Sequence, residues 1–118
     1  MNLVAFLGKD KENWGQLTAL INRGGYEKII LVKDRTTENF PASPITKLIS
    51  IDLSESITQV KEKIQDKLRN ELSKEFEVAL SLASGNGKEH MALVSALLSV
   101  PVGIKLVAYT KEGVEFLS

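Results

Sequence analysis

Residues 76–98 read FEVALSLASGNGKEHMALVSALL, and this stretch decides the fold. Its first part, 76–82, is mainly apolar, which is typical of a strand that is buried on both faces of a parallel sheet. The glycine-containing loop Ser84–Lys88 follows, and the apolar residues after it predict a helix from about 88 to 98. A buried strand that passes through a tight loop into a helix is the repeating unit of α/β proteins.

The remainder of the chain continues this alternation. The apolar run Leu3–Leu7, ended by Gly8, predicts a central first strand. Ser56 and Gln59 have the spacing of a capping box, which predicts the start of a surface helix. Further strands are predicted over 28–32, 48–53, 104–109 and 114–117, and helices from about Asn13 to Gly24 and from Ser56 to Leu72.

Helices between successive strands favour a mostly parallel sheet with right-handed crossovers. We therefore expect an α/β, Rossmann-like fold whose parallel central sheet is flanked by helices and followed by a short C-terminal β-hairpin. The length of 118 residues suits one domain over 1–118. The segment Asp34–Pro44 has no periodicity, so we expect a loop there and regard it as a candidate lid.

Composition excludes several classes of protein. The 15 basic and 15 acidic residues balance, so bulk charge does not favour binding to duplex DNA. The chain has no Cys and a single histidine, His90, which argues against disulfides, zinc–thiolate sites and multi-histidine metal centres. No apolar stretch is long enough for a membrane span. We expect a cytoplasmic protein without metal, cofactor or membrane partner.

The helix predicted over 88–98 has almost no polar face. A helix that is apolar all round is buried on more than one side. Either a second copy of the chain covers its outer side, as in an isologous dimer, or the fifth strand and the C-terminal hairpin cover it. The small size of the domain favours the homodimer.

Two loops carry the residues that are suited to ligand binding. If the first strand is central, with the second and fourth on either side, the loops after strands one and four meet at the switch point where α/β sheets bind ligands. Glycines expose backbone N–H groups, a helix start adds partial positive charge, and a lysine adds a full charge. The candidate ligand-binding residues are Gly8, Lys9, Asp10, Ser84, Gly85, Asn86, Gly87 and Lys88. A plain strand-to-helix turn is the alternative interpretation.

Three named fingerprints are absent from this loop. A Walker loop needs Gly at Leu82 and Ser or Thr at Glu89, and a dinucleotide fingerprint starting at Gly85 needs Gly or Ala at His90. A nucleophile elbow needs Gly at Leu82 and Asn86. Nucleotide hydrolysis of the P-loop kind, dinucleotide binding and acyl transfer by Ser84 are therefore not supported.

The loop resembles the CRISPR-associated Rossmann-fold sensor domain, CARF. In that family an apolar strand leads into a turn of the form Asp/Asn-x-Ser/Thr-x-x-x-Lys/Arg, and an apolar helix follows. Ser84 and Lys88 match this form, whereas Leu82 replaces its first acidic or amide residue. The resemblance implies a homodimer that binds a cyclic oligoadenylate, most often cyclic tetra-adenylate, across its two-fold axis in type III CRISPR antiviral signalling.

The resemblance also raises the possibility of catalysis. Some CARF proteins are ring nucleases that cut the ring without metal, by attack of a ribose 2′-OH on the adjacent phosphate, and leave a 2′,3′-cyclic phosphate. It implies Ser84 and Lys88 as candidate catalytic residues, and a lysine with backbone N–H groups is suited to stabilising a phosphate. No general base is evident, because we favour packing over catalysis for His90. For Trp14 we favour a core position over stacking on an adenine.

These observations leave several functions open. The chain is a ring-cleaving enzyme, a binder that sequesters the ring without cutting it, or a sensor that passes its state to a partner. The alternative from a different class is a Rossmann-like interaction module without a nucleotide ligand.

Overall fold

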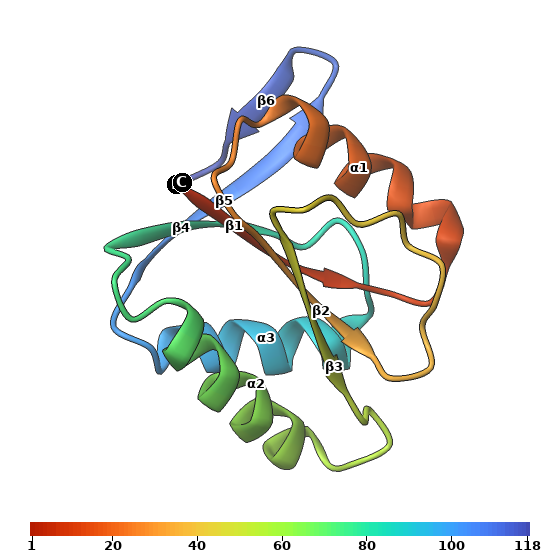
Figure 1. Ribbon diagram of the computed structural model, residues 1–118, viewed down its shortest axis with the longest axis vertical. Helices are drawn as coiled ribbons and strands as arrows, with labels where there is room; N and C mark the ends of the chain where they lie inside the picture. Colours follow the sequence, from red (N-terminus) through yellow and green to blue (C-terminus); the bar gives the residue numbers. More distant parts are fainter.

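The structure is a computed structural model that describes residues 1–118, and it is an α/β fold around one six-stranded sheet (Figure 1). The strand order is β3-β2-β1-β4-β5-β6; the first five are parallel, and β6 runs antiparallel to β5 as a C-terminal hairpin. The strands are β1 (Asn2–Leu7), β2 (Ile29–Asp34), β3 (Thr46–Ile51), β4 (Glu77–Ser81), β5 (Gly103–Thr110) and β6 (Gly113–Phe116). The helices are α1 (Trp14–Arg23), α2 (Ile57–Glu71) and α3 (Gly87–Leu98), and a 3-10 turn, Lys11–Asn13 (η1), precedes α1. The expected Rossmann-like architecture is confirmed.

Strand β1 is the centre of the sheet, as its continuous apolar run predicts. All six of its residues are buried, and it pairs with β2 on one side and β4 on the other. Val4 and Phe6 belong to one core cluster, and Leu3 and Leu7 belong to the other. A strand that contributes alternate side chains to two cores needs apolar residues at every position.

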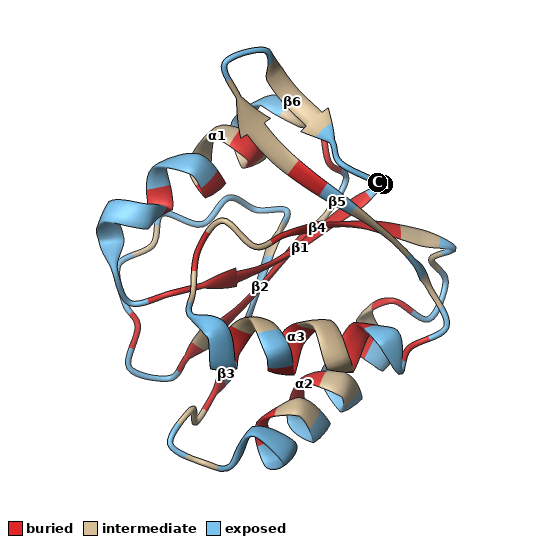
Figure 2. Cartoon of the chain, turned by 180° about the vertical axis from the view of Figure 1, so that it is seen from behind, coloured by how far each residue is buried: buried red, intermediate tan, exposed pale blue.

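The two faces of the sheet are covered unequally. Helices α2 and α3 lie side by side on one face, over a core of 17 buried residues, whereas α1 and the β5–β6 hairpin lie toward the other, over 11 (Figures 1 and 2). Helix α2 begins with the predicted capping box of Ser56 and Gln59. It turns Val60, Ile64 and Leu68 toward the core. None of the three helices is both long and apolar enough to cross a bilayer.

Helix α3 is covered on its second side by α2 (Figure 2). The hairpin, which was the alternative cover, instead packs Val107 and Val114 into the core beneath α1. That alternative holds for Ile104 at the start of β5, which packs against the core of α3, but not for the hairpin. Met91 and Leu98 of α3 remain 60% and 73% exposed, so the dimer stays a prediction.

Strand β2 is longer than predicted. It runs to Asp34, which was expected to begin the loop, because Asp34 continues the parallel register with Ile51 of β3. The extension carries a buried carboxylate to the carboxyl edge of the sheet.

Candidate functional site

The loops that follow β1 and β4 touch at the switch point of the sheet. The Gly8 N–H donates to Ser84 Oγ at 2.9 Å, and the Trp14 indole N–H donates to the Gly8 carbonyl at 2.8 Å. A Cβ atom at Gly8 would lie 2.8 Å from the Gly85 backbone nitrogen. Position 8 is therefore glycine because the two backbones approach more closely than a side chain allows.

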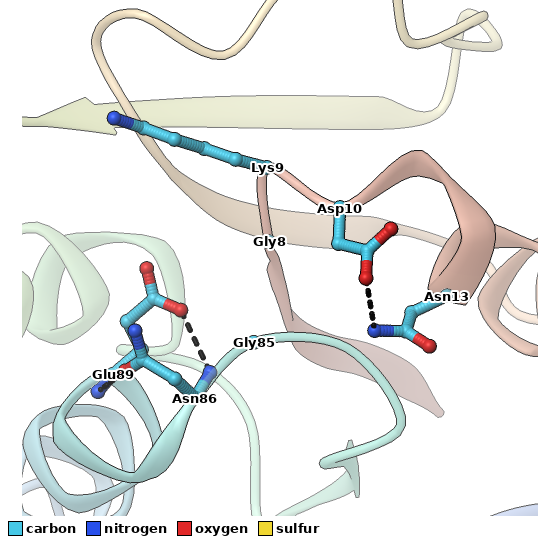
Figure 3. Close-up of a pocket in the computed structure, with 7 residues that line it drawn as sticks. All are labelled: Gly8, Lys9, Asp10, Asn13, Gly85, Asn86 and Glu89. Atoms are coloured by element: carbon cyan, nitrogen blue, oxygen red, sulfur yellow. Dashed lines mark hydrogen bonds between the residues drawn. The ribbon is translucent and has the colours of Figure 1, made fainter.

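A pocket of about 340 Å3 lies between these loops (Figure 3). It is lined by Gly8, Lys9, Asp10, Asn13, Gly85, Asn86 and Glu89, none of them hydrophobic. Five of the eight predicted ligand-binding residues are thus brought together, while Ser84, Gly87 and Lys88 do not line the pocket. Asn13 and Glu89 were not among the predicted binding residues.

Ser84 lies beneath the pocket rather than in it. It is only 2% exposed, and its hydroxyl oxygen accepts the Gly8 N–H. Its carbonyl oxygen is 2.8 Å from His90 Nε2, so His90 holds the turn, as the packing interpretation expects. The expected contact between the Ser84 hydroxyl and a ligand phosphate is not available in this arrangement.

Lys88 points away from the pocket. Its ammonium group donates to the Leu53 carbonyl at 2.9 Å and to the Glu55 carbonyl at 2.8 Å, both in the loop between β3 and α2. The sequence offers no signal for this contact, because 33 to 35 residues separate the partners. The β3–α2 loop is therefore a third element of the site.

The start of α3 is closed by a reciprocal cap. The Asn86 side chain accepts the Glu89 N–H at 3.0 Å, and the Glu89 carboxylate accepts the Asn86 N–H at 2.8 Å (Figure 3). The N–H groups of Gly85, Gly87 and Lys88 have no acceptor within the chain. These free donors, next to the positive end of the helix dipole, are suited to an anion.

The loop after β1 presents more of its charge to solvent. Asp10 lies at the pocket wall, where its carboxylate accepts the Glu12 N–H and approaches the Asn13 amide at 3.4 Å (Figure 3). Asp10 and Glu89 are both acceptors, so the pocket combines donors for anions with carboxylates that suit amino or hydroxyl groups.

Lys9 forms an ion pair with the buried carboxylate of Asp34, at 3.2 Å. Asp34 also accepts the Leu53 N–H at 3.0 Å, the Thr36 N–H at 3.2 Å and the Thr36 hydroxyl. Burial by itself raises the pKa of the Asp34 carboxyl, but the bonds from Thr36, Leu53 and Lys9 outweigh it and hold the pKa far below its usual range. Asp34 was not predicted as a site residue. The pattern that could have indicated it is an Asp at the end of an apolar strand, two residues before Thr36.

The segment Asp34–Pro44, considered a candidate lid, is attached to the protein near the site. Phe40 meets the Trp14 ring edge-on, with centroids 5.3 Å apart, and the Lys33 ammonium donates to the Thr37 carbonyl. Trp14 is buried in the core beneath α1, as expected. No three His, Asp or Glu side chains gather closely enough to hold a metal ion.

Comparison with known proteins bears on the fold alone. No family model and no curated protein matches the chain. A similar solved structure is the C-terminal domain of a hydrogenase from Pyrococcus furiosus, with a TM-score of 0.51 over 89% of each chain and 11% sequence identity. At this identity the likeness establishes a shared α/β architecture.

Proposed function

We propose that the chain binds a cyclic oligoadenylate, in the first instance cyclic tetra-adenylate, as a homodimer in type III CRISPR signalling. The observation that carries the proposal is the pocket, lined by no hydrophobic residue, at the junction of the loops after β1 and β4. Ligands of open α/β sheets bind at this switch point, outside the carboxyl ends of the strands.

The polar groups of the pocket suit the parts of such a ring. Its phosphates would accept bonds from the free N–H group of Gly85 and from Lys9. The Asn13 amide has the donor and acceptor pair that recognises an adenine edge. Asp10, beside it, would accept from an adenine amino group or a ribose hydroxyl.

The size of the pocket favours two protomers for each ring. A pocket of about 340 Å3 is at the lower end of the roughly 300–1,000 Å3 that small-molecule sites occupy. A ring of four nucleotides is larger than one such pocket, so two copies are required to enclose it. The exposed apolar side chains of Met91 and Leu98 on α3 are a surface that a second copy would cover.

Binding is favoured over cleavage. Ser84 and Lys88, the candidate catalytic residues, bond to Gly8 and to the β3–α2 loop, and neither lines the pocket. Backbone donors and Lys9 suffice for holding a phosphate, whereas ring opening also needs a group placed to take the proton of the attacking 2′-OH. We therefore propose a sensor or sequestering protein.

Calorimetry tests this function. The protein is titrated with cyclic tetra-adenylate in EDTA, the oligomeric state is measured by light scattering, and products are followed by mass spectrometry over hours. We expect one ring per two chains and no linear product. Appearance of a linear di-adenylate with a cyclic phosphate would show a metal-independent ring nuclease instead. Failure to bind rings of three, four or six adenylates would overturn the proposal.

Trp14 supplies an independent signal from the same site. It is the single tryptophan of the chain, and its indole N–H donates to the carbonyl of Gly8, which lines the pocket. Ligand binding at this loop is expected to change Trp14 fluorescence with the midpoint that calorimetry gives.

A further inference from the structure

Both lysines of the site are held by the chain's own oxygen atoms on the β2 and β3 side of the sheet. Lys9 reaches the Asp34 carboxylate at the end of β2. Lys88 reaches two carbonyl groups, those of Leu53 and Glu55, in the loop between β3 and α2.

The two attachments meet at one residue, Leu53. Its N–H donates to Asp34, which holds Lys9, and its carbonyl oxygen accepts from Lys88. The path Lys9–Asp34–Leu53–Lys88 therefore joins the loop after β1 to the start of α3 through the β3–α2 loop. The two ends of this path flank the pocket, because Lys9 lines it and Lys88 stands between Asn86 and Glu89, which also line it.

We propose that the two lysines are latches: an anionic ligand in the pocket draws them from Asp34 and from the Leu53 and Glu55 carbonyls, and so loosens residues 52–56 before α2. This inference rests on the proposed function and names the regulation of the same site. It gives the domain a way to report that its pocket is filled.

The exchange is chemically feasible at both ends. At Lys88, a charge-assisted bond to a phosphate is stronger than the bonds to neutral carbonyls, and at Lys9 one anionic partner replaces another. Both lysine side chains lie largely at the surface. Asp34 stays satisfied when Lys9 leaves, because Leu53 and Thr36 continue to donate to it. No buried charge is left without a partner.

The loop that would respond is also held by the Leu53 side chain, which packs against the larger core, and by the ion pair of Asp52 with Arg35. Ser54 bonds within the loop to Asp52, and Glu55 pairs with Lys63 of α2. The bonds from Lys88 are the ones that tie residues 53–55 to α3. Loss of these bonds removes the contact of residues 53–55 with α3, so the loop opens, and its amides exchange with solvent, more often.

Hydrogen–deuterium exchange of peptides that cover 50–58 tests the latch, with and without saturating cyclic tetra-adenylate. We expect severalfold faster exchange in the wild-type complex than in the free wild type. Free Lys88→Met should already exchange as fast as the wild-type complex and should gain nothing further from the ring. Lys111→Met, at an exposed hairpin turn without side-chain bonds, is the matched control and should behave as wild type.

Calorimetry on the same samples separates the possible failures. Lys88→Met is expected to weaken ring binding about tenfold, because the latch proposal gives Lys88 a phosphate contact. Binding with unchanged or slower exchange over 50–58, or an unchanged affinity of Lys88→Met, would overturn the latch and leave the proposed function standing. No binding by wild type would overturn both.

Discussion

The loops after β1 and β4 meet at the same point but use their polar groups differently. The loop after β4 turns its groups onto the protein: Ser84 bonds to Gly8, Asn86 to Glu89, and Lys88 to Leu53. The loop after β1 is anchored through its backbone at Gly8 and leaves Asp10 exposed at the pocket, while Lys9 stays largely exposed and pairs with Asp34. The loop after β4, whose composition suggested a phosphate site, therefore acts as a scaffold. The loop after β1 presents charged side chains at the surface.

This difference shows what composition can and cannot predict. Serine, asparagine and lysine in a glycine-containing turn are able to bond a ligand phosphate or a neighbouring backbone, and the residue types are the same in both cases. The direction of the side chain decides between the two, and it depends on which loop lies alongside. For Ser84 that neighbour is Gly8, which is 76 positions earlier in the chain.

The largest expected effect comes from forcing the two loops apart. Gly8→Ala places a Cβ 2.8 Å from the Gly85 nitrogen, and overpacking of this kind is expected to lower the free energy of unfolding by about 3 kcal/mol. Gly15→Ala is the matched control, because nothing lies within 4 Å of its Cβ. In helix α1 that alanine should stabilise by about 0.5–1 kcal/mol. Urea denaturation measures both, and equal effects would contradict the close approach.

A smaller effect is expected from removing the bond between the loops. Ser84→Ala leaves the buried Gly8 N–H without an acceptor, which should cost about 2 kcal/mol. Ser99→Ala, an exposed serine at the end of α3, should change the unfolding free energy by less than about 0.5 kcal/mol. If Ser84→Ala were as stable as wild type but lost ring binding, Ser84 would be a ligand contact and the scaffold interpretation would be wrong.

The smallest pair compares one capping residue from each loop. Asn86→Ala removes the cap of the twelve-residue helix α3 and should destabilise by about 1 kcal/mol. Asp10 caps only the three-residue turn η1 at the surface, so Asp10→Ala should cost no more than about 0.5 kcal/mol. Thermal unfolding of the two variants measures the difference, and the reverse order would contradict the assignment of scaffold and exposed loop.

The fold was largely predictable because its signals are local. The apolar runs at Leu3–Leu7 and in β4, the glycine after each, and the capping box at Ser56 determine strands and a helix without reference to distant residues. The strand order agrees with the doubly wound arrangement that was assumed for a central first strand.

The site was less predictable because its contacts are long-range. The sequence located Gly8, Lys9 and Asp10 at the correct edge, since strand ends meet there in any parallel sheet. It could not show that Asp34 extends β2 and pairs with Lys9. Nor could it show that α2, rather than the hairpin, covers α3, because each has an apolar face that could do so.

The central claim is that the pocket beside Lys9 binds a cyclic oligoadenylate. The most direct measurement is the calorimetric affinity of wild type, Lys9→Gln and the control Lys111→Gln for cyclic tetra-adenylate in EDTA. We expect binding by wild type and the control, and an affinity at least about tenfold lower for Lys9→Gln, the loss expected when one charge-assisted phosphate contact is removed. Equal affinity of all three proteins, or binding by none, would contradict it.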